Sequence, residues 1–228
     1  MSPSAVTAGE INMSLEMDLF EIAVRSIVVS GSATLLAGLW GVPLGIFIGL
    51  KKFYGRSLAK GFFNAMLGMP TVSLGLILYL LFSRAGSLGF LHLLYTPFAV
   101  ILGQSILITP IIVSFVASAI ESVDPEIRDL AKTLGASETQ ASIAVLSESL
   151  SGVLLAVIAS FNRAISELGV ALMLGGNLRN LTRVMTTAIS LETARGELDL
   201  GISLTVILLS IVFVLSFLTN LVQRRWRS

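Results

Sequence analysis

Residues 153–176 read VLLAVIASFNRAISELGVALMLGG and indicate where this chain resides. The run is apolar enough to lie in a lipid bilayer, yet it carries Arg163 and Glu167 near its middle. Charges at membrane depth are rare, and they usually pair or face protein or water. The two residues are four apart, so on a helix they share one face and can form an ion pair.

The composition of the whole chain also indicates a membrane protein. Only 13% of the 228 residues are charged, where soluble domains carry about a quarter, and the mean hydropathy is +0.90. A spanning helix needs roughly 20 mainly apolar residues. Five stretches qualify: 23–50, 61–82, 96–120, 151–175 and 200–222. We predict an all-α, multi-pass integral protein of the cell (inner or cytoplasmic) membrane with about five spanning helices.

The positions of the basic residues predict the orientation of the chain. The first and third connections and the C-terminal tail carry more Lys and Arg than the second and fourth connections. Cytoplasmic segments are the ones rich in Lys and Arg, so we predict an external N-terminus and a cytoplasmic C-terminus. Residues 1–18 are predicted as a flexible external segment, and residues 19–228 as one transmembrane domain with a cytoplasmic loop at 121–149.

Small residues in the first predicted span indicate close helix packing. Gly41, Gly45 and Gly49 recur every fourth position, on one helical face. Small residues let helix backbones approach closely inside lipid, where packing replaces the hydrophobic effect. We therefore predict that another helix packs against this face.

Two further spans carry a proline beside polar side chains. Proline leaves a backbone carbonyl without its helical partner, and this is tolerated at membrane depth where the site is buried or lines a water-filled cavity. The neighbouring hydroxyl and amide groups either satisfy that carbonyl or line a translocation path, and both roles stay open. These candidates for a path or gate are Thr71, Ser73, Gln104 and Thr109.

The loop ESVDPEIRDLAKTLGASETQASIAVLSES, residues 121–149, predicts a helix, a turn and a second helix. Asp124 is a favourable N-cap and Pro125 fits the first helical position. Gly135 ends that helix, and Ser137 begins a capping box for the next one. The apolar positions share one helical face, and a helix this short is marginal alone. The loop therefore needs a partner.

The run DLAKTLGASETQASIAVLSE resembles the coupling loop of ABC-importer permeases, whose pattern is E-A-A, three residues, G, nine residues, I-x-L-P. Asp129, Leu130 and Ala131 stand at the E-A-A positions and Gly135 at the glycine, whereas residues 147–148 depart from the usual leucine and proline. In that family the loop sits in a cleft of the ATP-hydrolysing subunit. The residues so implied in ATPase coupling are Asp124, Glu126, Asp129, Leu130, Ala131, Leu134, Gly135, Ala136 and Ser137.

The runs FNRAISELGVALMLGGN and TRVMTTAISLETARGELD are similar to permeases for the oxyanions sulfate, molybdate and tungstate, most of all to the tungstate branch. The resemblance implies a type I ABC importer transmembrane domain that moves its substrate by alternating access. It also implies a pair of ATP-binding cassette subunits, which hold ATP and Mg, and an external oxyanion-binding protein. We expect a homodimer in membrane lipid, with no cofactor in this chain and no nucleic acid as partner.

Other functions receive less support from the residues. The sequence contains no G-x-x-x-x-G-K-[ST], H-E-x-x-H or G-x-S-x-G run, so we predict no ATPase or other enzyme activity in this chain alone. No metal site is expected, since the chain has no cysteine and one histidine. A passive anion channel would not require the cytoplasmic helix pair. Molybdate and sulfate remain alternative substrates.

Two roles are open for Arg163 and Glu167. The pair can be structural, fixing its span against neighbouring helices or a second subunit. Alternatively, Arg163 gives the path a partly neutralised positive potential, which attracts a dianion without retaining it.

Overall fold

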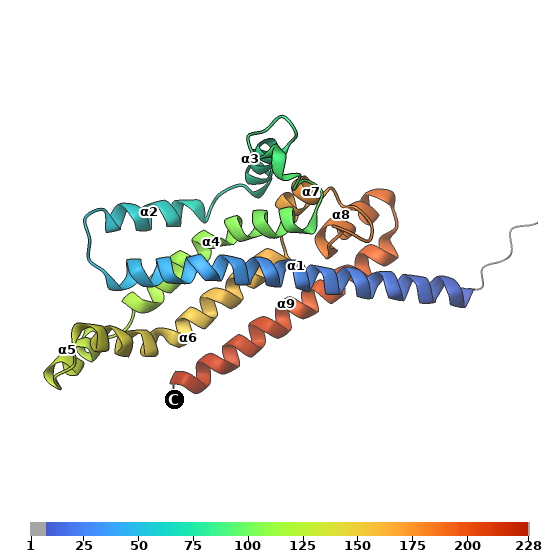
Figure 1. Ribbon diagram of the computed structural model, residues 1–228. Coiled ribbons are helices and arrows are strands. Elements are labelled where there is room, and N and C mark those ends of the chain that lie inside the picture. Colours follow the sequence, from blue (N-terminus) through green and yellow to red (C-terminus); the bar gives the residue numbers. More distant parts are fainter. Residues whose placement is uncertain (1–7, 228) are drawn as a thin grey trace, which may run out of the picture.

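The protein is described by a computed structural model that covers residues 8–227, with side-chain surroundings for residues 17–217, 219 and 221. Within this part the chain forms helices joined by short connections (Figure 1). In chain order they are α1 (Ala8–Leu50), α2 (Arg56–Met66), α3 (Thr71–Phe82), the short 3-10 helix η1 (Gly89–Leu91), α4 (Pro97–Glu121), α5 (Pro125–Thr133), α6 (Glu138–Ile165), α7 (Gly169–Gly175), α8 (Met185–Arg195) and α9 (Leu198–Arg227).

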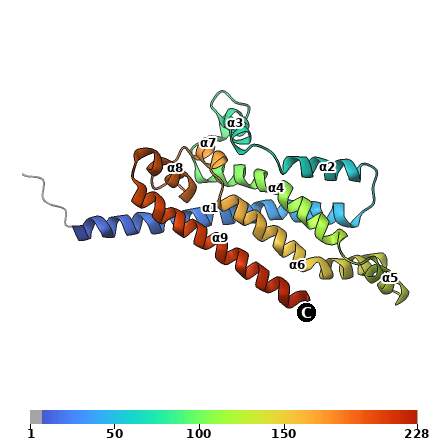
Figure 2. The same cartoon turned by 180° about the vertical axis from the view of Figure 1, so that it is seen from behind.

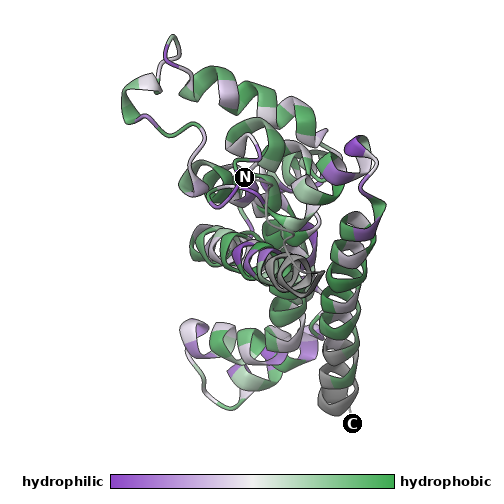
Figure 3. Ribbon diagram, turned by 90° about the vertical axis from the view of Figure 1, so that its right-hand side faces the viewer, coloured by the Kyte–Doolittle hydropathy of each residue, from purple (hydrophilic) through white to green (hydrophobic). Residues whose placement is uncertain are grey.

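Four of the described helices are long and apolar enough to cross a membrane. They are α4, α6, the Met17–Leu50 part of α1 and the Leu198–Phe217 part of α9. These helices pack against one another (Figures 1 and 2), and hydrophobic residues dominate them in Figure 3. The predicted all-α membrane architecture is confirmed.

The second predicted span, residues 61–82, is not a single straight helix. Its two halves belong to α2 and α3, which meet at an angle of 98°. Pro70 lies at this bend in an extended conformation, with φ −64° and ψ 122°. It has no backbone N–H, so the hydrogen-bond ladder of α2 cannot continue through it. With the bent pair taken as one span, the count reaches the predicted five.

The fourth predicted span, residues 151–175, is also divided. α6 begins well before it, at Glu138, and ends at Ile165, and α7 follows from Gly169. Arg163 therefore lies in the last turn of α6, while Glu167 lies in the connection. The prediction that both occupy the middle of one continuous helix is wrong, although the ion pair itself forms.

α1 packs against α4 along the predicted glycine face. A Cβ atom added at Gly45 would lie 2.7 Å from the Cβ atom of Val116. Cβ atoms added at Gly41 and Gly49 would lie 3.1 Å and 2.9 Å from isoleucines of α4. A side chain larger than that of glycine would push the two helices apart at these positions. The four-residue spacing of the glycines therefore correctly predicts a close contact between α1 and another helix.

The first helix is longer than its apolar part. α1 begins at Ala8, so residues 8–18 of the segment predicted to be flexible are helical, while residues 1–7 lie outside the described residues. Pro43 lies within α1, and the helix continues through it to Leu50. Because α1 begins well before its apolar part, its N-terminal half contacts α8 and the connection before it.

Candidate functional site

The helix pair predicted within residues 121–149 forms at one end of the molecule (Figures 1 and 2). Asp124 accepts a hydrogen bond from the backbone N–H of Glu126 (3.0 Å), which caps α5. Gly135 turns the chain with a φ of +87°, a region that favours glycine. Ser137 begins α6 with a reciprocal capping box. The local signals in the sequence therefore produce the predicted structure.

We name residues 124–140 the elbow; they comprise α5, the turn at Gly135 and the start of α6. Ion pairs join the two helices of the elbow. Arg128 and Lys132 of α5 both pair with Glu138 in the first turn of α6, and Lys132 Nζ lies 2.7 Å from the Glu138 carboxylate. A shared carboxylate makes a small network, which is worth more than an isolated surface pair. The caps and this network together fix the angle between α5 and α6.

The elbow carries exposed apolar side chains. Leu130 is 61% exposed and Leu134 is 79% exposed, and α5 contains no buried residue. Exposed leucines outside the spanning helices are a feature of docking surfaces. The elbow contains all nine residues implied in ATPase coupling: Asp124, Glu126, Asp129, Leu130, Ala131, Leu134, Gly135, Ala136 and Ser137.

Arg163 and Glu167 form an ion pair across the end of α6, with 2.5 Å between Nη1 and Oε2. The other carboxylate oxygen of Glu167 accepts a hydrogen bond from the Val170 N–H (3.2 Å), and its backbone carbonyl accepts one from the Thr186 hydroxyl (2.8 Å). Glu167 therefore links α6, α7 and α8. A charge at membrane depth is costly, and the pairing lowers that cost.

Gln104 of α4 also supports the end of α6. Its side chain is buried, and Nε2 donates a hydrogen bond to the Ala164 carbonyl (3.2 Å). Its Oε1 accepts a hydrogen bond from the Ser30 hydroxyl of α1 (3.4 Å). Gln104 thus lies between three helices and adds a side-chain donor to a carbonyl that already accepts the Glu167 N–H (3.1 Å).

A cavity of about 390 Å³ lies beside the break between α6 and α7. Arg163, Glu167, Ser166 and Thr71 contribute polar groups to its lining, and residues such as Leu172 and Met173 contribute apolar ones. The structure thus brings one predicted path residue, Thr71, to the same cavity as the intramembrane charged pair. The lining thus combines an ion pair, two hydroxyl groups and apolar walls, and a few polar groups in a mainly apolar pocket are typical of a binding site for a small molecule.

The remaining predicted path residues do not line this cavity. Ser73 is exposed on α3. Thr109 of α4 accepts a hydrogen bond from the indole N–H of Trp40 (2.7 Å) and donates one to the Ser105 carbonyl (2.7 Å). Thr109 therefore joins α1 to α4 in this conformation.

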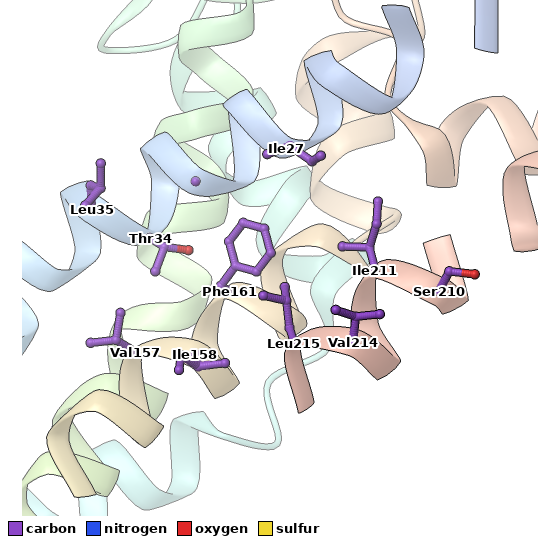
Figure 4. Close-up of a pocket in the computed structure, with 11 residues that line it drawn as sticks. Ile27, Thr34, Leu35, Val157, Ile158, Phe161, Ser210, Ile211, Val214 and Leu215 are labelled. Atoms are coloured by element: carbon purple, nitrogen blue, oxygen red, sulfur yellow. The ribbon is translucent and has the colours of Figure 1, made fainter. Parts of the chain in front are cut away.

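A larger cavity of about 650 Å³ lies between α1, α6 and α9 (Figure 4). Aliphatic side chains and Phe161 make up most of its lining. The Thr34 hydroxyl donates its hydrogen bond to the Ser30 carbonyl (2.7 Å), and the Ser210 hydroxyl points away from the labelled apolar side chains in Figure 4. A dianion that leaves water needs donors or cations in return. This cavity is therefore unsuited to an oxyanion.

Sequence reasoning missed the contacts around α8. Glu192 is buried, and its carboxylate lies 3.4 Å from Arg183 and 3.6 Å from Arg195. The Ser26 hydroxyl of α1 accepts a hydrogen bond from the Met185 N–H at the start of α8 (2.7 Å). The Arg183 and Ser26 partners lie far apart in sequence or in an irregular connection, where no local pattern predicts them, whereas Glu192 and Arg195 form a local pair three residues apart within α8. Within the described residues, no three His, Cys, Asp or Glu side chains gather as a metal site requires.

Comparisons with known sequences point to one class of protein. Residues 41–228 match the family described as binding-protein-dependent transport system inner membrane component. The chain is 38% identical over 209 residues to a probable anion ABC transporter permease protein of Haloferax volcanii, a match that covers 90% of this chain and 89% of the relative. It is 35% identical over 209 residues to the tungstate uptake system permease protein TupB of Peptoclostridium acidaminophilum, with 92% of each chain covered.

The fold also matches a solved structure. A chain of the MetNI methionine ABC transporter, in an inward-facing conformation, superimposes with a TM-score of 0.72 at 15% identity, covering 92% of this chain and 96% of that chain. At this identity the likeness concerns the fold alone. It confirms the predicted fold of an ABC-importer permease.

Proposed function

The chain belongs to the family of binding-protein-dependent transport system inner membrane components, and we propose that it is the membrane subunit of an ATP-driven importer for tungstate or a similar tetrahedral oxyanion. One observation carries the ATP-driven part of this proposal: the elbow holds Leu130 and Leu134 exposed on a rigid support. A passive pore has no need of such a surface. The chain itself supplies the path and no ATPase activity.

The proposed substrate follows from the relatives, because one is named for anion transport and another for tungstate uptake. The cavity beside Arg163 agrees with an anionic substrate. Molybdate and sulfate are also tetrahedral dianions, so they are the alternatives to test alongside tungstate.

In the proposed complex, two copies of this chain form the path, and each elbow docks on one ATP-binding cassette subunit. ATP and Mg belong to those subunits, and an external binding protein delivers the oxyanion. This arrangement requires the elbow to be cytoplasmic, with the N-terminus outside and the C-terminus inside. The excess of Lys and Arg in the connections on the elbow side supports that orientation.

The test is transport by the complete complex in proteoliposomes. The chain is purified with its ATPase and reconstituted, and the binding protein is supplied with labelled tungstate. We expect tungstate uptake that requires both ATP and the binding protein. Faster uptake of molybdate or sulfate would assign the alternative substrate, uptake without ATP would indicate a channel, and uptake of none of the three would refute the proposal.

A further inference from the structure

The two members of the intramembrane pair have different surroundings. The side chain of Glu167 is 2% exposed, whereas that of Arg163 is 39% exposed. A pair that only joined helices within this one chain would bury both partners. The asymmetry therefore leaves the Arg163 guanidinium able to contact a group outside this chain, a ligand or a second copy.

Glu167 is fixed in place by three interactions. Its carboxylate binds Arg163 and the Val170 N–H, and its carbonyl accepts the Thr186 hydroxyl. These partners belong to α6, α7 and α8 or their edges, so Glu167 cannot move without disturbing all three. The carboxylate consequently anchors one N–H group of the Arg163 guanidinium.

Arg163 lines the cavity that it shares with Thr71, Ser166 and Glu167. An intramembrane guanidinium does not face lipid tails, so the cavity must contain water or be covered by protein. The bond to Glu167 uses one of the five N–H groups of the guanidinium. The remaining donors have the planar geometry that binds oxyanions in pairs.

On the basis of the proposed function, we propose that Arg163 contacts the transported dianion directly, with Glu167 as the residue that positions Arg163. The adjacent carboxylate keeps the local charge near neutral. The dianion is thus attracted by hydrogen bonds but is not retained as it would be by an unpaired arginine. Leu172 and Met173 in the cavity wall reduce the number of competing waters, which strengthens each of these hydrogen bonds.

A neutral double variant separates this proposal from a structural role. Substituting Arg163→Gln together with Glu167→Gln leaves two amides that can hydrogen-bond to each other, and no buried charge remains unpaired. If Arg163 contacts the dianion, the complex assembles while tungstate uptake falls about tenfold or more, as expected for loss of hydrogen bonds to a charged group. Normal uptake by an assembled double variant would overturn the proposal.

The control variant is Arg84→Gln, which removes the same charge from an exposed connection. It should leave uptake unchanged. The wild-type complex is measured in parallel, because its failure to transport tungstate, molybdate or sulfate would refute the proposed function rather than the role of Arg163.

A second measurement does not require Arg163 to be replaced. The natural chain contains no cysteine, so Thr71→Cys introduces one thiol into the cavity. We expect a sulfonate-bearing methanethiosulfonate to label this thiol faster than a trimethylammonium-bearing one, and tungstate to slow the labelling. A preference for the cationic reagent, or no labelling with and without ATP and vanadate, would overturn the proposal even if the double variant failed to assemble.

Discussion

Replacing Gly45 by alanine should weaken the contact between α1 and α4. The added methyl group would lie 2.7 Å from the Cβ atom of Val116 and 3.0 Å from the carbonyl oxygen of Val113. Carbon atoms in contact prefer about 3.5–4.0 Å, so the helices must separate by about 1 Å. Val116 is fully buried and has little room to retreat.

The magnitude follows from two opposing effects. Overpacking a filled core costs about 1–3 kcal/mol, while replacing a helical glycine by alanine gains about 0.5–1 kcal/mol. Gly38 of the same helix provides a matched control, because a Cβ atom there would meet nothing within 4 Å. Both variants receive the helical gain, so the difference between them isolates the packing cost of about 1–3 kcal/mol.

The assay is thermal unfolding of the purified protein in detergent, followed by the fraction that stays monodisperse in size-exclusion chromatography. For a chain of this length, about 2–4 °C of melting temperature corresponds to 1 kcal/mol. Gly45→Ala should therefore melt about 2–12 °C below Gly38→Ala. Equal melting temperatures, or a higher one for Gly45→Ala, would refute the close packing of these two helices.

Three further predictions concern the elbow and the end of α6. Leu134→Ala should weaken ATPase binding by about 1–2 kcal/mol, or five- to thirtyfold, in a pull-down titration, whereas Leu39→Ala, equally exposed but within a span, should have no effect there. At Gly135 an added methyl group would meet no neighbouring atom, but the turn requires a φ of +87°, which alanine rarely adopts. Gly135→Ala should therefore strain the turn and weaken ATPase binding by about 1–2 kcal/mol; unchanged binding would contradict a role for the turn. Gln104→Leu removes two buried hydrogen bonds, to the Ala164 carbonyl and from the Ser30 hydroxyl, and should lower stability by about 1–3 kcal/mol in the same melting assay. Full stability would argue against a role for Gln104 in joining these helices.

Local signals in the sequence predict the elbow and the glycine face well. The cap at Asp124 and the turn at Gly135 depend on residues within one or two helical turns, so the sequence alone specifies them. Pro70 is a local signal for the bend before α3. The surrounding residues are apolar over a length sufficient for one span, so the sequence is interpreted as a single span despite this proline. A long hydrophobic stretch predicts burial in lipid, but it says little about where a helix stops inside the membrane.

The break at residues 166–168 depends on tertiary contacts. Glu167 accepts hydrogen bonds from Val170, which is local, and from Thr186, which lies on another element. Gln104 reaches the Ala164 carbonyl from a different helix. No periodicity in the sequence encodes such partners. The pairing of Arg163 with Glu167 is predictable from their spacing, while their unequal exposure required the fold.

α6 joins the elbow to the charged cavity as one uninterrupted helix of 28 residues, about 42 Å long at 1.5 Å per residue. It therefore has the geometry of a lever: a displacement applied at Glu138 reaches Arg163 through a single stiff element, with no joint between them. The distance between the proposed ATPase contact and the proposed anion contact is then set by the number of helical turns. Deleting one turn from α6 would bring Arg163 about 5.4 Å closer to the elbow. ATP hydrolysis and substrate uptake would then no longer be coupled as in the natural chain.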